Sequence, residues 1–449
     1  MSSVQASDPA HSRDARLFPG DNFWVGAIIL TMPVRELSLG QVGPGFIRLG
    51  DLVLAGAVLM WVLTELKQRG RSLRLNALDG FVVLFLALYI LSILWSDQFE
   101  WGVLRLAKLT RNTLLYLLLV QYLRQDIIVR FTRLAMFFVA SGVVSSLAYL
   151  VSIQQAGGTT ALGVMFSADT LASSDERLTV VKGDQGAGVF LKGVASWLPL
   201  CSLLGVTFLN DSRRSLRALG TWLAIGLMVG LTLLTMTRAA WIALVAAVVV
   251  TLLADVPARS FRRAGALGLF VAILGLVGLG GTLLGIANSR FTDGLLLEDQ
   301  SVQERLTFFA IALERFTTNP IFGGGVASID PAEFLVVHNA YLQVLGELGL
   351  VGAAVFLVML FLWVYYLFAV RRHCKRRRDR HAQGLVASVG GATAFFLVYF
   401  LAGHDLGSGE PWIVLALASA LYSASRMAIS ANRGSLVPPP AVRRIPQTA

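Results

Sequence analysis

Long apolar segments alternate with short polar connections along most of the chain. An α-helix needs about 20 mainly apolar residues to cross about 30 Å of hydrocarbon. Segments with the short alternating pattern of a membrane barrel are absent from the sequence. The pattern therefore predicts an all-α integral membrane protein, a single polytopic domain over 1–449. Its spans, about 12 transmembrane helices, are expected near 23–34, 46–65, 76–95, 103–123, 130–153, 188–208, 218–236, 239–254, 264–286, 350–370, 385–403 and 411–427.

Two connections are much longer than the others, at 154–187 and 287–349. The second is a large loop between the ninth and tenth spans. Within it, 303–316 has the spacing of an amphipathic helix, expected to rest on the membrane surface or at the mouth of the bundle. Its apolar side is predicted to carry Leu306, Phe309, Ala310, Leu313 and Phe316.

The residues that follow this helix indicate a sharp change of direction. Asn319 and Pro320 are expected to end the helix, and three glycines come next at 323–325. Glycine permits a sharp turn or a close approach to a ligand. A second helix is predicted to begin at His338 and to lead into the tenth span.

The distribution of charge sets the expected orientation. The mean hydropathy is +0.68 and the net charge is +11, but the basic residues gather in every second connection, most densely at 371–381. Basic connections mark the cytoplasmic side of a membrane, so topology explains the charge better than a nucleic-acid partner does. Both termini are expected in the cytoplasm, and both long loops are expected to face outward, toward the periplasm if the protein lies in the inner membrane of a Gram-negative bacterium.

Cations on the outward side are informative, because a charge near hydrocarbon is costly unless it is used or paired. Arg238 lies in TMTRAAW, a very short connection between the seventh and eighth spans. An anionic headgroup is expected to reach it there, although a plain interfacial anchor is the alternative. Lys192 follows the glycine-rich DQGAGVF, and Arg305 lies on the predicted loop helix. For each of these two alone, ordinary surface charge is the better interpretation.

A basic stripe enters the fourth span. Its members stand at positions i, i+3 and i+6, which share one side of a helix, and such a stripe suits a lipid phosphate. The alternative is that the side chains snorkel or pair with Asp97 and Glu100. The stripe consists of Arg105, Lys108 and Arg111.

Two histidines fall on the outward side, His338 and His404. Histidine is the side chain best suited to acid or base chemistry near neutral pH. His404, followed by Asp405, is best explained as part of a loop turn. His338 opens a helix beside Asn339 in the large loop, which makes it the candidate for acid or base chemistry.

Several common sites are missing from the sequence. It contains no P-loop, no dinucleotide fingerprint, no HExxH zinc motif and no CxxC pair. Neither outward loop contains DxD, which would hold a metal and a nucleotide-sugar. No cofactor and no metal are therefore expected.

Four motifs resemble the bacterial O-antigen polymerase and ligase superfamily, and among its members O-antigen ligase most. They are TMTRAAW, Arg305 with the apolar helix after it, NP-I-FGGG, and VHNAYLQVLGELGLVG, spread over about 188–370. The resemblance implies that Arg238, Arg305 and Lys192 bind a pyrophosphate and that His338 is catalytic. The family often has arginine where Lys192 stands, and lysine lacks the planar fork of arginine.

The resemblance also implies a reaction and its partners. O-polysaccharide would move from an undecaprenyl pyrophosphate carrier to lipid A-core, without metal and with inversion, as a step of lipopolysaccharide biosynthesis. An O-antigen polymerase and a protein O-oligosaccharyltransferase are close alternatives that use the same kind of donor. A lipid-linked oligosaccharide transporter is an alternative of another class, and it would need polar groups through the midplane of the membrane.

Overall fold

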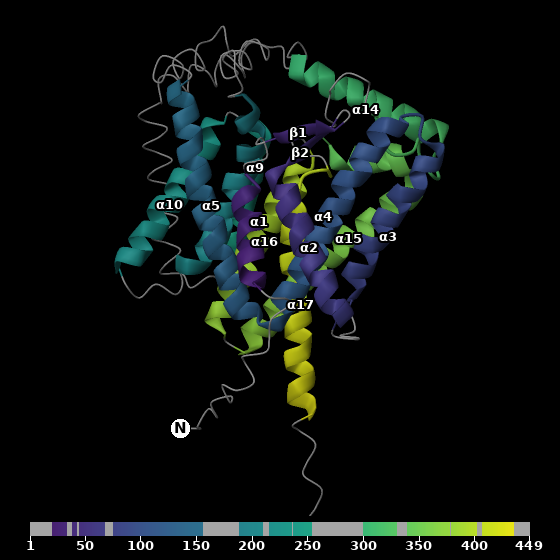
Figure 1. Ribbon diagram of the computed structural model, residues 1–449. Coiled ribbons are helices and arrows are strands. Elements are labelled where there is room, and N and C mark those ends of the chain that lie inside the picture. The colour runs from purple at the N-terminus through teal and green to yellow at the C-terminus, as the bar shows by residue number, and fades with distance from the viewer. Residues whose placement is uncertain are drawn as a thin grey trace, which may run out of the picture.

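The protein is a bundle of long helices (Figure 1). The computed structural model describes residues 20–33, 38–42, 45–67, 75–155, 188–209, 215–235, 237–253, 300–329, 339–377, 379–401 and 406–434. The first half of the bundle comprises α1 (Asp21–Thr31), α2 (Leu49–Lys67), α3 (Ala77–Ser92), the 3₁₀ turn η2 (Ile93–Trp95), α4 (Phe99–Gln125) and α5 (Ile127–Gln155). The second half comprises α9 (Gly188–Gly205), the 3₁₀ turn η3 (Val206–Leu209), α10 (Ser215–Leu234), α11 (Arg238–Leu253), α15 (Ala340–Arg377), α16 (Arg380–Tyr399) and α17 (Glu410–Gly434), while α14 (Gln300–Thr318) lies across one end.

Most of the expected spans coincide with these helices. Eleven of the twelve segments overlap a helix, and the segment at 264–286 lies outside the described residues. In the part of the chain that the structure describes, five stretches are long and apolar enough to cross a membrane, within α2, α3 with η2, α5, α15 and α16. The same part contains three shorter apolar helices, within α9 with η3, α10 and α11. The chain is thus a helical membrane protein, and the total of twelve spans stays a prediction.

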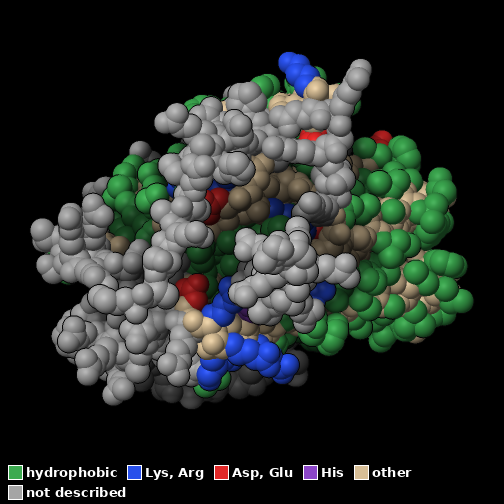
Figure 2. Space-filling model, turned by 90° about the horizontal axis from the view of Figure 1, so that it is seen from below, with side chains coloured by type: hydrophobic (Ala, Val, Ile, Leu, Met, Phe, Trp, Pro, Cys, Tyr) green, Lys and Arg blue, Asp and Glu red, His purple; other side chains and the backbone are tan. Residues whose placement is uncertain are grey.

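The surface of the bundle supports this assignment. Large hydrophobic side chains are exposed along the outer faces of the helices, such as Leu84 at 44%, Phe361 at 67% and Phe368 at 54%. Figure 2 shows hydrophobic side chains covering one flank, with Lys and Arg on the end of the molecule that faces the viewer. Exposed apolar surface of this extent needs lipid to cover it.

The two ends of the bundle differ in what they carry. We call the end where α14 lies and α15 begins the loop end. At the opposite end, Arg371 near the end of α15 donates to the Leu253 carbonyl at the end of α11 (2.6 Å). Arg130 pairs there with Asp21 at the start of α1 (3.0 Å). The first described helix therefore begins, and α17 ends, at the end opposite α14 (Figure 1), as an even number of spans requires.

One short hairpin accompanies the helices of this all-α fold. β1 (Ser38–Val42) and β2 (Gly45–Arg48) form an antiparallel hairpin between α1 and α2, in which Val42 pairs with Gly45. The two residues that connect the strands are glycine and proline, and both favour turns. Two strands this short do not alter the helical architecture.

The loop helix is present, and residues other than those of the expected apolar side pack against the rest of the protein. Phe308 and Ala312 are buried in α14, and both pack with Ile329. By contrast, Leu306 is 44% exposed and Leu313 is 54% exposed. The apolar residues of α14 occupy a wide arc of the helix, so spacing alone could not show which part of it packs against the bundle.

The predicted second helix and tenth span form one element, α15. Its 38 residues would reach about 57 Å at about 1.5 Å per residue, well beyond the hydrocarbon core. Gly349 interrupts the helical conformation with φ 61° and ψ −157°. The kink separates the short segment at the loop end from the long membrane-spanning segment.

Candidate functional site

The segment after α14 folds back onto the kink of α15. We call residues 319–329 the glycine loop. The Gly324 N–H donates to the Gly346 carbonyl (2.8 Å), and the Gly325 N–H donates to the Glu347 carbonyl (2.9 Å). Leu350 N–H returns a bond to the Pro320 carbonyl (2.9 Å). Backbone hydrogen bonds in both directions therefore fasten the loop to α15.

Three glycines make this contact possible. Gly323, Gly325 and Gly349 have φ values of 68°, 92° and 61°, a conformation that side chains disfavour. A Cβ at Gly323 would lie 2.5 Å from the Glu347 carbonyl carbon. From the sequence, the glycines at 323–325 could serve either a sharp turn or a close approach to a ligand. In the structure, the group that lies close to them is the protein's own backbone.

The glycine loop also fastens the end of α3 and the connection from η2 to α4. The Ser96 hydroxyl donates to the Val326 carbonyl (2.6 Å), and Val326 N–H donates to the Ser92 hydroxyl (3.1 Å). Gly325 packs so closely here that an added Cβ would lie 2.7 Å from Ser96 Cα. The loop thus joins α3, η2 and α15 into one unit at the loop end.

A buried ion pair lies directly beneath this junction. Arg105 of α4 pairs with Glu347 of α15. The Glu347 side chain is fully buried, and the Arg105 side chain is 12% exposed. The Gln343 amide donates to the second oxygen of Glu347 (3.4 Å). Sequence reasoning missed Glu347, although a lone carboxylate within an apolar segment is a signal of use or pairing.

Arg111, another residue of the basic stripe, has a partner that was not considered from the sequence. Arg111 pairs with Asp51 of α2 (3.2 Å) and donates to the Gly407 carbonyl (2.9 Å). Asp97, considered as a partner of the stripe, instead pairs with Arg315 of α14 (2.7 Å). Lys108 is exposed. Within the described residues, the arginines of the stripe therefore join helices, and their contact with a lipid phosphate stays a prediction.

Asn339 has a local structural role. Its side-chain oxygen accepts from Leu342 N–H (3.0 Å), which caps the start of α15. Its amide donates to the Leu401 carbonyl just after α16 (3.1 Å). The chain position next to His338 is thereby fastened to the end of α16.

For three of the remaining candidate residues the structure describes the backbone but not the side chain, and two others lie outside the described residues. Arg238 is the first residue of α11, Arg305 lies in α14, and Lys192 lies in the first turns of α9. Because α11 ends beside Arg371, Arg238 stands at the loop end. His338 and His404 lie outside the described residues.

The start of α9 is also at the loop end. Ser196, one turn after Lys192, donates to Glu410 at the start of α17 (3.2 Å). Asn112 of α4 donates to the carbonyls of Leu406 and Ser408 just before α17 (3.3 and 3.1 Å). The fold therefore collects the backbone positions of Lys192 and Arg238, far apart in sequence, at the same end as Arg105.

The ion pair is expected to matter for stability. Removing one partner of a buried pair leaves the other charge without compensation and costs about 3–5 kcal/mol. We therefore expect Glu347→Ala to lower the thermal stability of the purified protein markedly. The double variant Glu347→Ala, Arg105→Met should recover much of the loss, because no buried charge remains. A double variant as unstable as the sum of both single changes would contradict this role.

The fold defines a class, a helical membrane protein whose loop end holds a buried ion pair beside the glycine loop. Residues 223–357 match the model of a family described as O-antigen ligase. The matched segment runs from α10 to α15 and contains Arg238, Arg305 and His338, whereas Lys192 and the basic stripe precede it. The match confirms the resemblance to this superfamily of glycosyltransferase-like enzymes. A sequence search of curated proteins gives no match.

Proposed function

We propose that the protein is an O-antigen ligase, a metal-independent glycosyltransferase of lipopolysaccharide biosynthesis. It transfers O-polysaccharide from undecaprenyl pyrophosphate to a hydroxyl of lipid A-core. The observation that carries the proposal is the family match over 223–357. That segment includes the loop helix, the glycine loop and His338. These are the features to which the resemblance assigns a functional role.

The chemistry of the candidate residues suits this transfer. Pyrophosphate leaves as the bond from the anomeric carbon to its oxygen breaks, and the guanidinium groups of Arg238 and Arg305 stabilise the developing negative charge. Lys192 adds a third positive charge. Since fixed cations act most strongly where water is excluded, no metal is required for the departure of the carrier.

The acceptor supplies the other half of the reaction. Its hydroxyl oxygen forms the new bond to the anomeric carbon as His338 takes the hydroxyl proton. Attack from the face opposite to the leaving pyrophosphate inverts the configuration of the anomeric carbon. The braced junction of Arg105, Glu347 and the glycine loop supports the proposal, because it holds the start of α15 close to this chemistry.

The orientation proposed for this reaction places the loop end in the periplasm and both termini in the cytoplasm. Thr317 in α14 is exposed at the loop end, and Lys375 near the end of α15 is exposed at the opposite end. Both native cysteines are buried, so they react slowly with a membrane-impermeant thiol reagent. The orientation is tested by labelling Thr317→Cys and Lys375→Cys in cells with a permeable outer membrane. We expect Thr317→Cys to be modified first, and modification of Lys375→Cys first would show the opposite orientation.

The lipopolysaccharide of a deletion strain tests the function. A ligase attaches every polymer chain that lipid A-core carries. In the deletion strain we therefore expect loss of the polymer ladder and accumulation of polymer on the lipid carrier. Complementation with the intact gene should restore the ladder. Core carrying a single repeat would instead identify a polymerase, and an unchanged ladder with loss of glycan on a protein would identify an oligosaccharyltransferase.

A further inference from the structure

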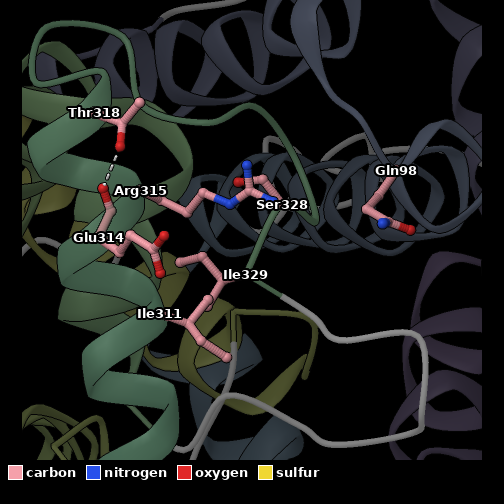
Figure 3. Close-up of a pocket in the computed structure, with 7 residues that line it drawn as sticks. All are labelled: Gln98, Ile311, Glu314, Arg315, Thr318, Ser328 and Ile329. Atoms are coloured by element: carbon pink, nitrogen blue, oxygen red, sulfur yellow. Dashed lines mark hydrogen bonds between the residues drawn. The ribbon is translucent and has the colours of Figure 1, made fainter.

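A pocket of about 480 Å³ lies at the loop end between α14 and the start of α4. Its α14 wall includes Ile311, Glu314 and Arg315, and Ile329 from the glycine loop faces them (Figure 3). Pockets that hold small ligands have volumes of about 300–1,000 Å³. The pocket is therefore large enough for a ligand the size of a sugar residue.

One buried polar group in this pocket has no protein partner. The Ser328 hydroxyl lines the pocket, the residue is 4% exposed, and no described group forms a hydrogen bond with its oxygen. A buried hydroxyl without a hydrogen bond is costly. Arg315 extends from α14 toward Ser328 (Figure 3). A ligand hydroxyl placed here would supply the missing bond.

The other polar groups form a mixed set of donors and acceptors. Gln98 and Glu314 lie on different sides of the pocket (Figure 3). A carboxylate accepts from two hydroxyls, and an amide both donates and accepts. Arg315 uses one nitrogen to bind Asp97 (2.7 Å), while a guanidinium has five N–H donors. Vicinal hydroxyl groups match such an arrangement.

The charge of the pocket argues against a phosphate. Its arginine is already paired with one carboxylate, and Glu314 places a second carboxylate beside it. A phosphate group would meet net negative charge here. Ile311 lines the pocket and is only partly buried, so it offers an apolar surface against which the C–H face of a sugar ring could pack. An uncharged, hydroxylated ligand satisfies both features.

The pocket lies at some distance from the proposed chemistry. Arg305 and Arg315 are ten residues apart on α14, which is about 15 Å along the helix axis. A ligand in the pocket would therefore belong to a part of a glycan remote from the reacting bond. Loss of a remote contact changes substrate binding more than the chemical step.

We propose that this pocket is a subsite for one neutral sugar residue of a glycan substrate. The glycan is the acceptor core oligosaccharide or the donor O-polysaccharide, and this identification rests on the proposed function. Glu314 and Ser328 bind ring hydroxyls, Arg315 and Gln98 complete the contacts, and Ile311 packs against the ring.

Steady-state kinetics of the full chain in lipid nanodiscs test the subsite. We expect Ser328→Ala to raise the KM for one glycan substrate by about 2- to 10-fold and Glu314→Gln by about 10-fold, both with kcat within about twofold. Ser328→Ala should fold normally, because the hydroxyl that it removes has no protein partner. The matched control is Thr317→Ala, since Thr317 and Thr318 both donate to the Glu314 carbonyl at 2.9 Å but only Thr318 lines the pocket.

The substrate whose KM rises identifies the occupant. A rise for lipid A-core, lost when the outer core sugars are removed, assigns the subsite to the acceptor. A rise for the lipid-linked polysaccharide assigns it to the donor. A KM within twofold of wild type for both substrates in both variants would overturn the proposal, and so would an equal rise in Thr317→Ala.

A binding measurement separates this proposal from the proposed function. Core oligosaccharide and O-antigen repeat, each released from its lipid, are added to the detergent-solubilised protein, and saturation-transfer NMR detects contact. If wild-type protein transfers no glycan but binds one of these oligosaccharides, and Glu314→Gln does not bind it, the subsite stands and the ligase function fails. Transfer by wild type with no binding difference between the two proteins would leave the function and remove the subsite.

Discussion

Replacing His338 with alanine is expected to reduce glycan transfer by about 10²- to 10⁴-fold, the usual contribution of a positioned general base. The acceptor hydroxyl must lose its proton as it attacks, and among the outward histidines His338 stands within the family match whereas His404 does not. Protein abundance and donor binding should remain normal. A histidine with a purely structural role would instead lower transfer and abundance together.

Purified variants assayed with lipid-linked polysaccharide and lipid A-core measure this effect. His373→Ala is the matched control. His373 lies near the end of α15, whereas His338 precedes the start of this helix in the chain. His404→Ala should also retain most of its activity. Wild-type transfer should fall toward acidic pH, since a base must be neutral to accept a proton. Retention of more than about a tenth of the wild-type rate in His338→Ala at saturating acceptor would refute the role.

The second large effect is expected at Arg238. Loss of one positioned donor to a developing negative charge costs about 10²- to 10³-fold in rate, so Arg238→Ala should lose transfer by this order. Arg238 begins α11, and the positive end of a helix dipole favours an anion at that position. Arg238→Lys should recover only part of the activity, because lysine cannot form the bidentate contact. Arg305→Ala is expected to behave in the same way.

The control for these variants is an arginine of the opposite end. Arg372 of α15 is exposed there, so Arg372→Ala removes the same charge without approaching the proposed site. Rates are compared at equal amounts of folded protein, together with the affinity for the lipid pyrophosphate carrier. Normal transfer by Arg238→Ala would exclude this arginine from the site, and full recovery in Arg238→Lys would exclude a bidentate contact.

Apolar periodicity was sufficient to predict most of the helices. A bilayer imposes one length and one composition on every helix that crosses it, so the spans could be located without knowledge of their neighbours. The loop helix was predictable from its spacing for the same local reason. Its packing face was not, because Phe308 and Ala312 are buried by Ile329 of the following loop and Leu342 of α15.

The motifs of the candidate site were visible in the sequence, but their physical roles were not. The glycines at 323–325 could be recognised as a turn, whereas their bonds to Gly346 and Glu347 join segments that periodicity does not relate. Asn339 was named beside His338, and its function as the cap of α15 depends on the exact start of that helix.

Contacts between residues remote in sequence mark the limit of prediction. Arg105 and Glu347 are 242 positions apart, and each alone fits several interpretations, including a lipid contact for Arg105. Their pairing depends on which helices are neighbours and on the rotation of each helix, and a hydrophobic pattern does not specify either for two helices that are both surrounded by apolar side chains. The local pattern of the chain thus sufficed for the membrane helices and the candidate residues. Packing of distant segments decided which charges are braced, which glycines touch backbone, and where a pocket forms.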